Sequence, residues 1–187
     1  MRKVAIDDVD REDADPERAR ERRDLTDPLG AANVAVSRYV LDPGERFSGS
    51  LHAHADQEEV FLVVEGTATF ETTANDDAND EPSDVTVSAG EAIRFAPGEF
   101  QTGRNEGDEP VVAFALGAPR DSEDVRISRI PVLDDRDISC PDCGRGDMRI
   151  ARGGDGNEAG DGDCDGDGDD PDADFVCPDC SGTLALD

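Results

Sequence analysis

The sequence predicts an all-β fold, a sandwich, jelly roll or barrel, followed by a small zinc-ribbon module. From Asn33 onward the apolar residues form runs of strand length, each ended by Pro, Gly or Asp clusters, with no helical stretch between them. Two Cys-x-x-Cys pairs follow near the C-terminus. The 187 residues suffice for one ordinary domain with a small addition, because a single core holds roughly 100 to 200 residues.

Five apolar segments are the clearest predicted strands. They are residues 33–41, 60–71, 85–87, 92–95 and 111–116. Residues 42–45 and 96–99 share a Pro-Gly-Glu sequence that predicts turns, because Pro fixes φ and Gly permits a positive φ. The acidic stretch 73–84 is predicted to be the excursion of a hairpin. Short strands without helices between them are typical of closed or two-layered β structures.

Changes in composition divide the chain into four predicted segments. Residues 1–30 form a charged N-terminal arm, which mixes acids with bases and has no clear apolar stripe. A β-barrel is predicted at 31–118, a linker at 119–137 and the zinc ribbon at 138–187. Within the ribbon, residues 153–174 contain acids and no bases, which indicates an Asp/Gly surface loop of low complexity.

The charge balance excludes two classes of partner. The chain has 47 acidic and 18 basic residues, a formal net charge of −29, and Lys3 is its only lysine. Neither a nucleic acid nor an anionic membrane is an expected partner, because both are bound by basic patches. Acid spread over the whole chain resembles the surfaces of proteins from extremely halophilic archaea, on which dense carboxylates maintain solubility in molar salt.

The sequence contains no predicted membrane or targeting segment. No apolar stretch approaches the ~20 residues of a membrane helix, and residues 1–10 lack the apolar core of a secretory signal. We therefore expect a cytoplasmic protein. In that compartment five cysteines indicate metal binding rather than disulfides.

The two histidines of the chain, His52 and His54, predict a metal site. Residues i and i+2 of a strand share one face, so both imidazoles would point the same way. Glu59 follows, and a bend over residues 55–57 would return its carboxylate toward the imidazoles. Glu58 is the alternative carboxylate. Two histidines and one carboxylate with open positions suit Fe(II), Mn(II), Ni(II) or Zn(II).

The residues around this cluster resemble the first motif of the cupin family. That motif has a Gly, five residues, His-x-His, three or four residues, Glu, six residues and a second Gly. The matching positions are His52, His54, Glu59 and Gly66. Gly44 lies two residues further upstream than the motif's first glycine. Because six residues separate Glu59 from Gly66, the motif favours Glu59 over Glu58.

The second cupin motif is Gly, five residues, Pro-x-Gly, two residues, His, three residues and Asn. Gly90, Gly98 and Asn105 stand at its expected places. Ala96 replaces the Pro, and Gln101 replaces the His that is normally the fourth metal ligand. Gln101 is therefore a candidate ligand through its amide oxygen, and hydrogen bonding within the pocket is its alternative role.

The resemblance covers roughly residues 33–118 and implies a double-stranded β-helix, the cupin jelly roll, with the metal ligands inside the barrel. The implied ligand set for a divalent transition metal is His52, His54, Glu59 and Gln101. Tyr39 and Arg94 are further candidates for a ligand pocket. Small cupins commonly dimerise through barrel edges, so the resemblance also implies a homodimer, with a candidate face at Val60, Leu62 and Val64.

The cysteine pairs predict a structural zinc site. Cys140, Cys143, Cys177 and Cys180 form two Cys-Pro-Asp-Cys sequences, and four thiolates suit a closed tetrahedral zinc. Strands of the ribbon are predicted at 148–151, 174–176 and 183–186. A redox-active pair is the alternative, but no βαβ pattern adjoins either pair.

Two features of the acidic loop carry weaker expectations. Cys164 has no partner cysteine, and the aspartates beside it would raise its pKa, so we expect no reactive thiol there. Residues 161–172 resemble the beginning of an EF-hand loop, but Asp172 stands where the usual bidentate Glu would be. A solvated acidic loop is the favoured interpretation over calcium binding.

Two functions are compatible with these residues. The first is a metal-binding cupin that holds a small polar ligand in the barrel as a binding or sensor module, with the ribbon docking to a protein partner. The second is a metal-dependent cupin enzyme, a dioxygenase or an isomerase, that uses the same pocket. Beyond the proposed ligands the predicted barrel has no His or Lys to move protons, which favours the first.

Overall fold

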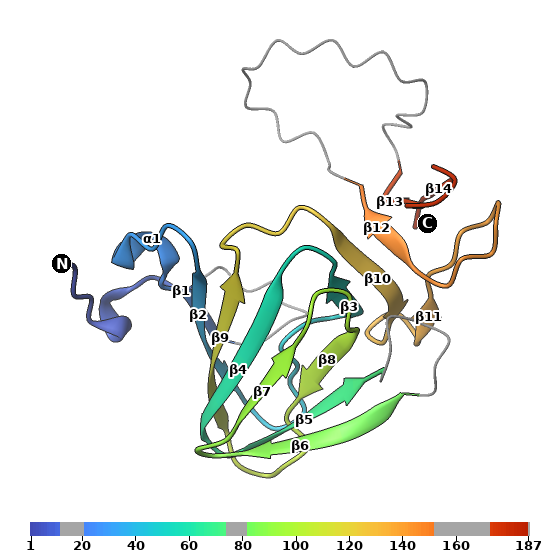
Figure 1. The fold of residues 1–187 in the computed structure, drawn as a ribbon. Coiled ribbons are helices and arrows are strands. Elements are labelled where there is room, and N and C mark those ends of the chain that lie inside the picture. Colours follow the sequence, from blue (N-terminus) through green and yellow to red (C-terminus); the bar gives the residue numbers. More distant parts are fainter. Residues whose placement is uncertain (12–20, 74–81, 152–172, 187) are drawn as a thin grey trace.

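The computed structural model describes residues 1–11, 21–73, 82–151 and 173–186. In these segments two antiparallel β-sheets form a barrel, and a small module of short strands extends from one of them (Figure 1). The fold is therefore all-β, as predicted, and the described helices are short: the 3-10 turn η1 (Ile6–Asp8) and α1 (Thr26–Leu29). None of the helices in these segments has the length and apolar character needed to cross a membrane.

The first sheet has five strands. In spatial order these are β1 (Glu21–Asp24), β2 (Ala35–Leu41), β9 (Val111–Ala118), β4 (Glu58–Glu65) and β7 (Ala92–Phe95). The predicted strand at 92–95 has the observed bounds, whereas the single strand predicted at 60–71 is two strands in different sheets. Gly66 divides them with a φ of 76°, and a Cβ there would lie 2.6 Å from the Pro110 carbonyl oxygen, so the turn requires glycine.

The second sheet has nine strands. Their order is β14 (Thr183–Leu184), β13 (Phe175–Val176), β12 (Met148–Ile150), β10 (Val125–Ile130), β3 (Leu51–His54), β8 (Gln101–Arg104), β5 (Thr67–Thr72) and β6 (Ser83–Ser88), with β11 (Arg136–Asp137) beside β10. From β2 to β10 the chain passes back and forth between the two sheets, apart from the β5–β6 hairpin. This winding produces a double-stranded β-helix.

Aromatic side chains fill the space between the two sheets. Phe47 and Phe70 stack with ring centroids 5.5 Å apart, and Phe61 lies 4.9 Å from Phe70. All three are buried, and burial of each stabilises the fold by about 2 to 3 kcal/mol. A Cβ on Gly103 would lie 2.6 Å from both Phe47 and Phe70, so β8 passes this cluster only because it has glycine there.

Three turns of the barrel have the same hydrogen-bond pattern. They cover residues 42–45, 88–91 and 96–99; the first and third are the predicted Pro-Gly-Glu turns. The third residue of each is a glycine with a φ of 87°, 87° or 89°. The fourth is a glutamate whose carboxylate accepts the backbone N–H of the first residue at 2.7 to 2.8 Å. Each glutamate thus closes its turn through its side chain and its own backbone N–H.

The barrel sheet begins inside the segment predicted as an N-terminal arm. Residues Glu21–Asp24 pair with β2 as an edge strand. Arg23 is buried there and donates to the backbone carbonyls of Ile6, Asp7 and Val9 at 2.6 to 3.2 Å. The sequence pattern did not reveal this strand, because an edge strand held by backbone pairing and a buried arginine needs no apolar stripe.

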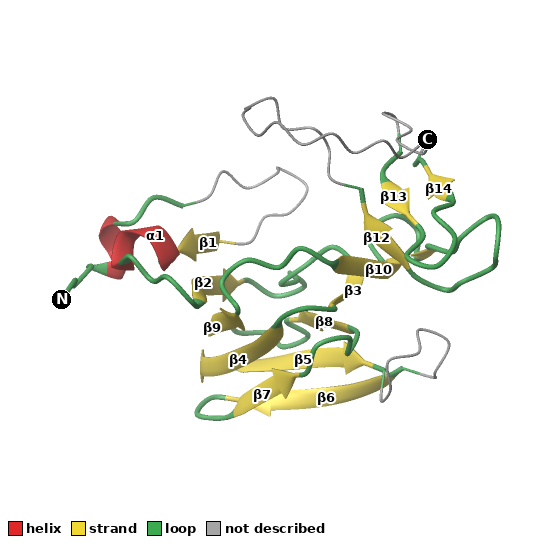
Figure 2. Cartoon of the chain, turned by 45° about the horizontal axis from the view of Figure 1, so that its top comes forward, coloured by secondary structure: helices red, strands yellow, loops and turns green. Residues whose placement is uncertain are grey.

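The predicted linker also contains a strand of the sheet. Residues Val125–Ile130 form β10, which pairs with β3 on one side and with β12 on the other. Ile127, Ile130 and Met148 bury their side chains in one apolar cluster with the cysteine module. The nine-stranded sheet of the barrel therefore continues through β10 into the cysteine module, as Figure 2 also shows.

The face expected to support a homodimer lies on an interior strand. β4 pairs with β7 and β9, so both of its edges are occupied within the chain. Leu62 and Val64 face outward and are about 40% exposed, at 39% and 45%. A dimer on this strand would use side-chain packing on the sheet face rather than edge pairing.

Some sequence predictions concern residues outside the described segments. These are most of the acidic hairpin excursion 73–84, most of the Asp/Gly loop 153–174, Cys164 and the EF-hand-like segment 161–172.

Candidate metal and ligand site

β3 brings the two histidines to one face. Leu51 and Ala53 of this strand are buried together with Phe100 in a small apolar cluster, so His52 and His54 project to the opposite face, into the barrel. Their ring centroids lie 5.3 Å apart and their planes are nearly perpendicular, at 79°. The i, i+2 spacing thus places two imidazoles side by side.

A bend after β3 returns a carboxylate to the histidines. The Asp56 carboxylate accepts hydrogen bonds from the Ser122 hydroxyl and the Glu123 backbone N–H, both at 2.6 Å, and these contacts hold the bend. β4 then begins, and the Glu59 carboxylate lies 3.9 Å from His54 Nε2. Glu58 faces the other way, where it accepts a hydrogen bond from Arg94 Nε at 2.7 Å.

Gln101 completes the group from β8, which pairs with β3 at His52. Its side-chain amide is buried; Nε2 donates to Glu59 Oε2 at 2.9 Å and lies 3.3 Å from His52 Nε2. The Gln101 Oε1 atom is buried and has no hydrogen-bond partner among the described residues. A half-turn of the amide would exchange Oε1 and Nε2, and would bring the oxygen to the histidine and the glutamate.

The surroundings of His52 fix which of its nitrogens is available. Nδ1 lies 3.1 Å from the Ser50 carbonyl oxygen, which can only accept a hydrogen bond. The proton of the neutral ring therefore lies on Nδ1, and Nε2 presents its lone pair to the barrel interior. A carbonyl that orients a histidine in this way is typical of the groups around metal-binding histidines.

The residues present fit a divalent transition metal. One ligand atom each from His52, His54 and Glu59 lies within 4.8 Å of the other two. Imidazole nitrogens and a carboxylate oxygen match the donors preferred by Mn, Fe, Ni and Zn. The buried Gln101 Oε1 has no hydrogen-bond partner among the described residues, and after a half-turn of the amide it would add a fourth donor at the same point.

Burial keeps the metal-free site close to neutral. Burial raises the pKa of Glu59 to about 7, although the Gln101 hydrogen bond and the Arg22 charge act in the opposite direction. Burial also lowers the pKa of His54, against the smaller opposing effect of Asp56. A bound cation would compensate the charge of the buried Glu59 carboxylate.

The candidate ligands lie in a cavity of about 340 Å³. Its lining residues are Arg22, Ala35, Ser37, Tyr39, Phe47, Ser48, His52, His54, Gln57, Glu59, Phe61, Gln101, Ala115, Gly117, Arg120, Ser122 and Val125. Tyr39, a candidate pocket residue from its sequence position, is one of these lining residues. Arg94 is not: it is on the outside of the sheet with Glu58, because β7 pairs with β4 at a position that faces solvent.

Several lining residues were not anticipated from the sequence. Arg22 lies on β1, within the predicted N-terminal arm, and Arg120 and Ser122 lie in the predicted linker. These residues were missed because both segments were predicted to lie outside the barrel. Gln57 also faces the cavity, where its Nε2 donates to the Pro119 carbonyl oxygen at 2.6 Å. The alternation of side chains along a strand could have placed Arg22 on the cavity face, but only if residues 21–24 had been recognised as a strand.

The four predicted zinc ligands meet in the cysteine module. The Sγ atoms of Cys140 and Cys180 are 3.5 Å apart, those of Cys143 and Cys177 are 3.6 Å apart, and all four lie within 4.8 Å of one another. Bonds of 2.3 Å to a tetrahedral zinc give sulfur–sulfur separations of about 3.8 Å, so the spacing fits zinc. These separations are also far longer than a disulfide bond.

Both cysteine pairs adopt the same backbone turn. The Gly144 N–H donates to the Cys140 carbonyl at 3.0 Å, and the Ser181 N–H donates to the Cys177 carbonyl at 3.1 Å. Gly144 and Ser181 have positive φ values of 76° and 61°. The backbone N–H of Cys143 lowers the pKa of the Cys140 thiol to about 7. Against the opposing effect of the Gly182 N–H, the neighbouring cysteines raise the pKa of Cys180 to about 12, so a bound cation would be needed to hold all four as thiolates.

Comparison with known families identifies the barrel. Residues 37–117 match the family described as the cupin domain. The barrel has the cupin fold. The matched cupin segment extends from β2 to β9, so it contains His52, His54, Glu59 and Gln101 but neither β1 nor the cysteine module. A comparison with curated protein sequences finds no match.

Solved cupin structures resemble this chain at low sequence identity. A sugar phosphate isomerase of the cupin superfamily from Silicibacter pomeroyi is 18% identical with a TM-score of 0.58, and the match covers 80% of this chain and 87% of that one. An oxalate oxidase in complex with glycolate is 16% identical with a TM-score of 0.53, over 66% and 61% of the two chains. A predicted oxalate decarboxylase from Thermotoga maritima is 20% identical with a TM-score of 0.51, over 63% and 98%. At these identities the likeness concerns the fold.

Proposed function

We propose that this protein is a metal-binding cupin that holds a small polar ligand in its barrel and acts as a binding or sensor module. The observation that carries the proposal is the convergence of His52, His54 and Glu59 at the base of one cavity. Three protein donors leave open coordination positions, at which a bound divalent metal would act as a Lewis acid toward ligand oxygen atoms.

Each protein residue has a defined part in this proposal. His52 Nε2 donates its lone pair, because Ser50 holds the proton on Nδ1. Glu59 supplies the negative charge, and Gln101 supplies either an amide oxygen to the metal or an N–H to the carboxylate. Tyr39 lines the same cavity and would contact the ligand. The alternative function, a metal-dependent dioxygenase or isomerase, would use the same residues. If the metal-loaded chain converts a ligand into a product, the enzyme replaces the binding module as the proposed function.

We also propose that Cys140, Cys143, Cys177 and Cys180 hold a structural zinc. The module buries few apolar side chains, and a metal bound by four thiolates would supply the stabilisation that so small a core lacks. The four ligands leave no open position for chemistry.

Calorimetric titration with Mn²⁺ tests the barrel site, in a chain that retains zinc in its cysteine module and has no metal in its barrel. We expect one site in the wild type, loss of about 100-fold or more in affinity in His54→Ala, and wild-type affinity in Glu58→Gln. Glu58→Gln is a matched control, because it changes the adjacent carboxylate that faces away from the cavity. Equal Mn²⁺ affinity in the wild type and His54→Ala would refute the proposal.

A further inference from the structure

The chain has few nitrogen donors to offer a metal in the barrel. Its two histidines, His52 and His54, both belong to the candidate site, and its only lysine is Lys3. Every further protein donor at this point is therefore an oxygen atom, from the Glu59 carboxylate or from the Gln101 amide. Which atom of the Gln101 amide faces the site then decides whether a fourth donor is present.

In the structure the Gln101 amide joins two of the candidate ligands to each other. Its Nε2 donates to Glu59 Oε2 at 2.9 Å and lies 3.3 Å from His52 Nε2. Both neighbouring atoms are acceptors, because the neutral His52 ring has its proton on Nδ1, beside the Ser50 carbonyl oxygen. The amide N–H groups therefore contact the same lone pairs that would bind a metal.

The oxygen end of the same amide has no such contact. Gln101 is 2% exposed, and its buried Oε1 accepts no hydrogen bond from the described residues. Buried acceptors without a partner are uncommon in folded proteins, and an ion is one of the groups that can satisfy them. A half-turn about the Cγ–Cδ bond exchanges the two ends of the amide, so that Oε1 would lie between His52 and Glu59.

The sheet holds the backbone of Gln101 in place while the side chain turns. Gln101 pairs with His52 of β3 on one side and with Thr72 of β5 on the other, so both edges of its strand are occupied. The amide nitrogen only donates hydrogen bonds, whereas the amide oxygen has two lone pairs. A cation at the site therefore favours the orientation in which the oxygen faces inward.

The type of donor at this position affects which metal the barrel prefers. Imidazole nitrogen suits Fe, Ni, Cu and Zn, whereas carboxylate and carbonyl oxygen suit Mg, Ca and Mn. An amide oxygen at Gln101 gives two nitrogen and two oxygen donors, and an imidazole there would give three nitrogens and one oxygen. The amide therefore disfavours Ni²⁺ more than it disfavours Mn²⁺, relative to an imidazole at the same place.

We propose that Gln101 determines the metal selectivity of the barrel, by turning its amide oxygen to the metal and shifting the preference of the site toward Mn²⁺. This inference deepens the proposed function and rests on it. It assigns Gln101 the role of a metal ligand, and the hydrogen bond from Nε2 to Glu59 is the arrangement that precedes metal binding. The two sites of the chain then differ in chemistry, with thiolates for zinc in the cysteine module and an oxygen-rich set in the barrel.

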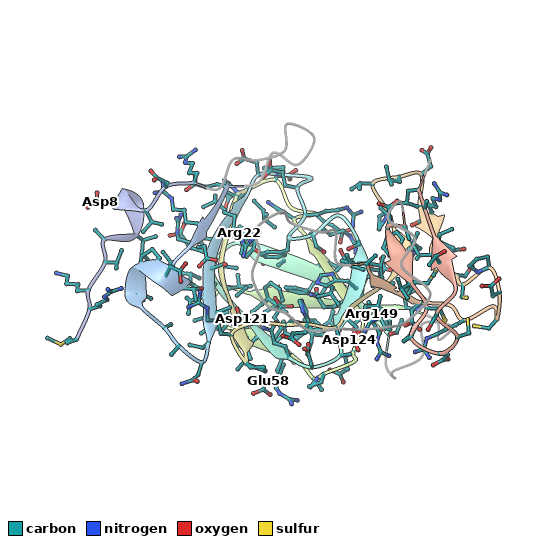
Figure 3. All side chains as sticks on the ribbon, turned by 90° about the horizontal axis from the view of Figure 1, so that it is seen from above. Asp8, Arg22, Glu58, Asp121, Asp124 and Arg149 are labelled. Carbon is teal, nitrogen blue, oxygen red and sulfur yellow. The ribbon has the colours of Figure 1, made fainter. Side chains whose placement is uncertain are left out.

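The first test compares the Mn²⁺ and Ni²⁺ affinities of the full chain by calorimetric titration, with zinc retained in the cysteine module. Gln101→His adds a third imidazole, so the ratio of Ni²⁺ to Mn²⁺ affinity should rise by about tenfold or more. Gln101→Glu retains an oxygen donor and should not show this rise. Glu58→Gln is the control, because Glu58 lies at the outer edge of the barrel in the view from above (Figure 3) and pairs with Arg94.

The second test shows whether Gln101 itself contacts the metal. Gln101→Leu has a side chain of similar size without a donor atom, so water should take the place of the amide oxygen on the metal. Pulsed EPR of the Mn²⁺-loaded chains in D₂O should therefore detect more metal-bound water in Gln101→Leu than in the wild type. This measurement decides the matter if Gln101→His does not fold.

Two results would overturn the proposal. One is equal metal-bound water in the wild type and Gln101→Leu, which would show that the amide does not contact the metal. The other is a ratio of Ni²⁺ to Mn²⁺ affinity in Gln101→His that is no higher than in the wild type. Failure of the wild-type barrel to bind either metal would instead refute the proposed function, and this inference with it.

Discussion

Glu59 lines the cavity and is largely shielded from solvent, with its side chain 17% exposed. Its pKa in the metal-free fold is about 7, against 4.5 for a glutamate in water, because burial disfavours the charged form. The protonated carboxyl is therefore the form that the metal-free fold favours. Metal binding has the opposite requirement, because the ligand is the carboxylate.

The first prediction concerns the stability of the metal-free chain against pH. A pKa that folding raises contributes stability below the unfolded value of 4.5, and this stability is lost as pH rises through about 7. The contribution of Glu59 is about 3 kcal/mol at full effect. Urea unfolding at pH 4.5 and at pH 8 measures this effect. Between these two pH values the free energy of unfolding should fall by about 3 kcal/mol more in the wild type than in Glu59→Gln. Parallel curves for the two chains would contradict the assigned pKa.

The second prediction concerns metal affinity against pH. Below pH 7 a proton competes with the metal for Glu59, so the Mn²⁺ affinity of the wild type should fall by up to about tenfold per pH unit. Calorimetric titrations at pH 6, 7 and 8 measure this slope. Glu58→Gln should preserve it, because Glu58 faces the other side of the strand. An affinity independent of pH would show that Glu59 is not a ligand.

At the scale of elements, β10 connects the two metal sites. Its residues Val125 and Ile127 pair with His54 and His52 of β3. The Ile127 side chain is buried in the apolar cluster that contains Cys140 and Cys177, and β12 of the cysteine module pairs with the other edge of β10. β3, which carries the histidines, thus pairs with β10, and β10 in turn pairs with β12 of the cysteine module.

The third prediction follows from this shared strand. A Cys140→Ser/Cys177→Ser variant should lose zinc, and amide hydrogen exchange at residues 51–54 and 125–130 should become faster. Mn²⁺ affinity of the barrel should fall by about tenfold, because the histidines are then less well positioned. Cys164→Ser is the control, since it removes a thiol outside the four. Unchanged exchange in β3 would show that the two sites are independent.

The elements also show how far the sequence leads. Alternating or continuous apolar runs predicted β2, β7 and β9, and the His-x-His spacing predicted the direction of both imidazoles. β1 and β10 were missed, because β1 is rich in charge and the apolar residues of β10 are interrupted by two Arg and a Ser without regular alternation. Their strand character comes from pairing with residues far away in the chain, which local patterns do not contain. Of the cavity residues missed from the sequence, Arg22 belongs to β1 and Arg120 lies in the connection between β9 and β10.

At the scale of the whole molecule, charge is the dominant feature. The 47 acidic residues greatly exceed the 18 basic ones, and many of the described arginines form ion pairs, such as Arg104 with Asp84 and Arg145 with Asp179. Repulsion among the remaining carboxylates disfavours the compact state at low salt. The Debye length falls from about 10 Å at 0.1 M salt to about 3 Å at 1 M, which screens this repulsion.

The fourth prediction is therefore a rise in stability with salt. Between 0.1 and 1 M KCl the free energy of unfolding should increase by about 1 kcal/mol or more, which raises the Tm by about 2 to 4 °C for a chain of this size. Thermal unfolding of the metal-loaded chain at several salt concentrations measures it. A Tm that is constant or falls over this range would contradict the role given to the acidic surface.

The central claim is that one chain holds two metals, one in the barrel and one in the cysteine module. Element-resolved metal analysis of the purified full chain and of a His52→Ala/His54→Ala variant tests it most directly. We predict one zinc plus a second equivalent of a divalent transition metal in the wild type, and the zinc alone in the variant. A single equivalent of zinc in both chains would contradict the claim and leave the barrel as a metal-free pocket.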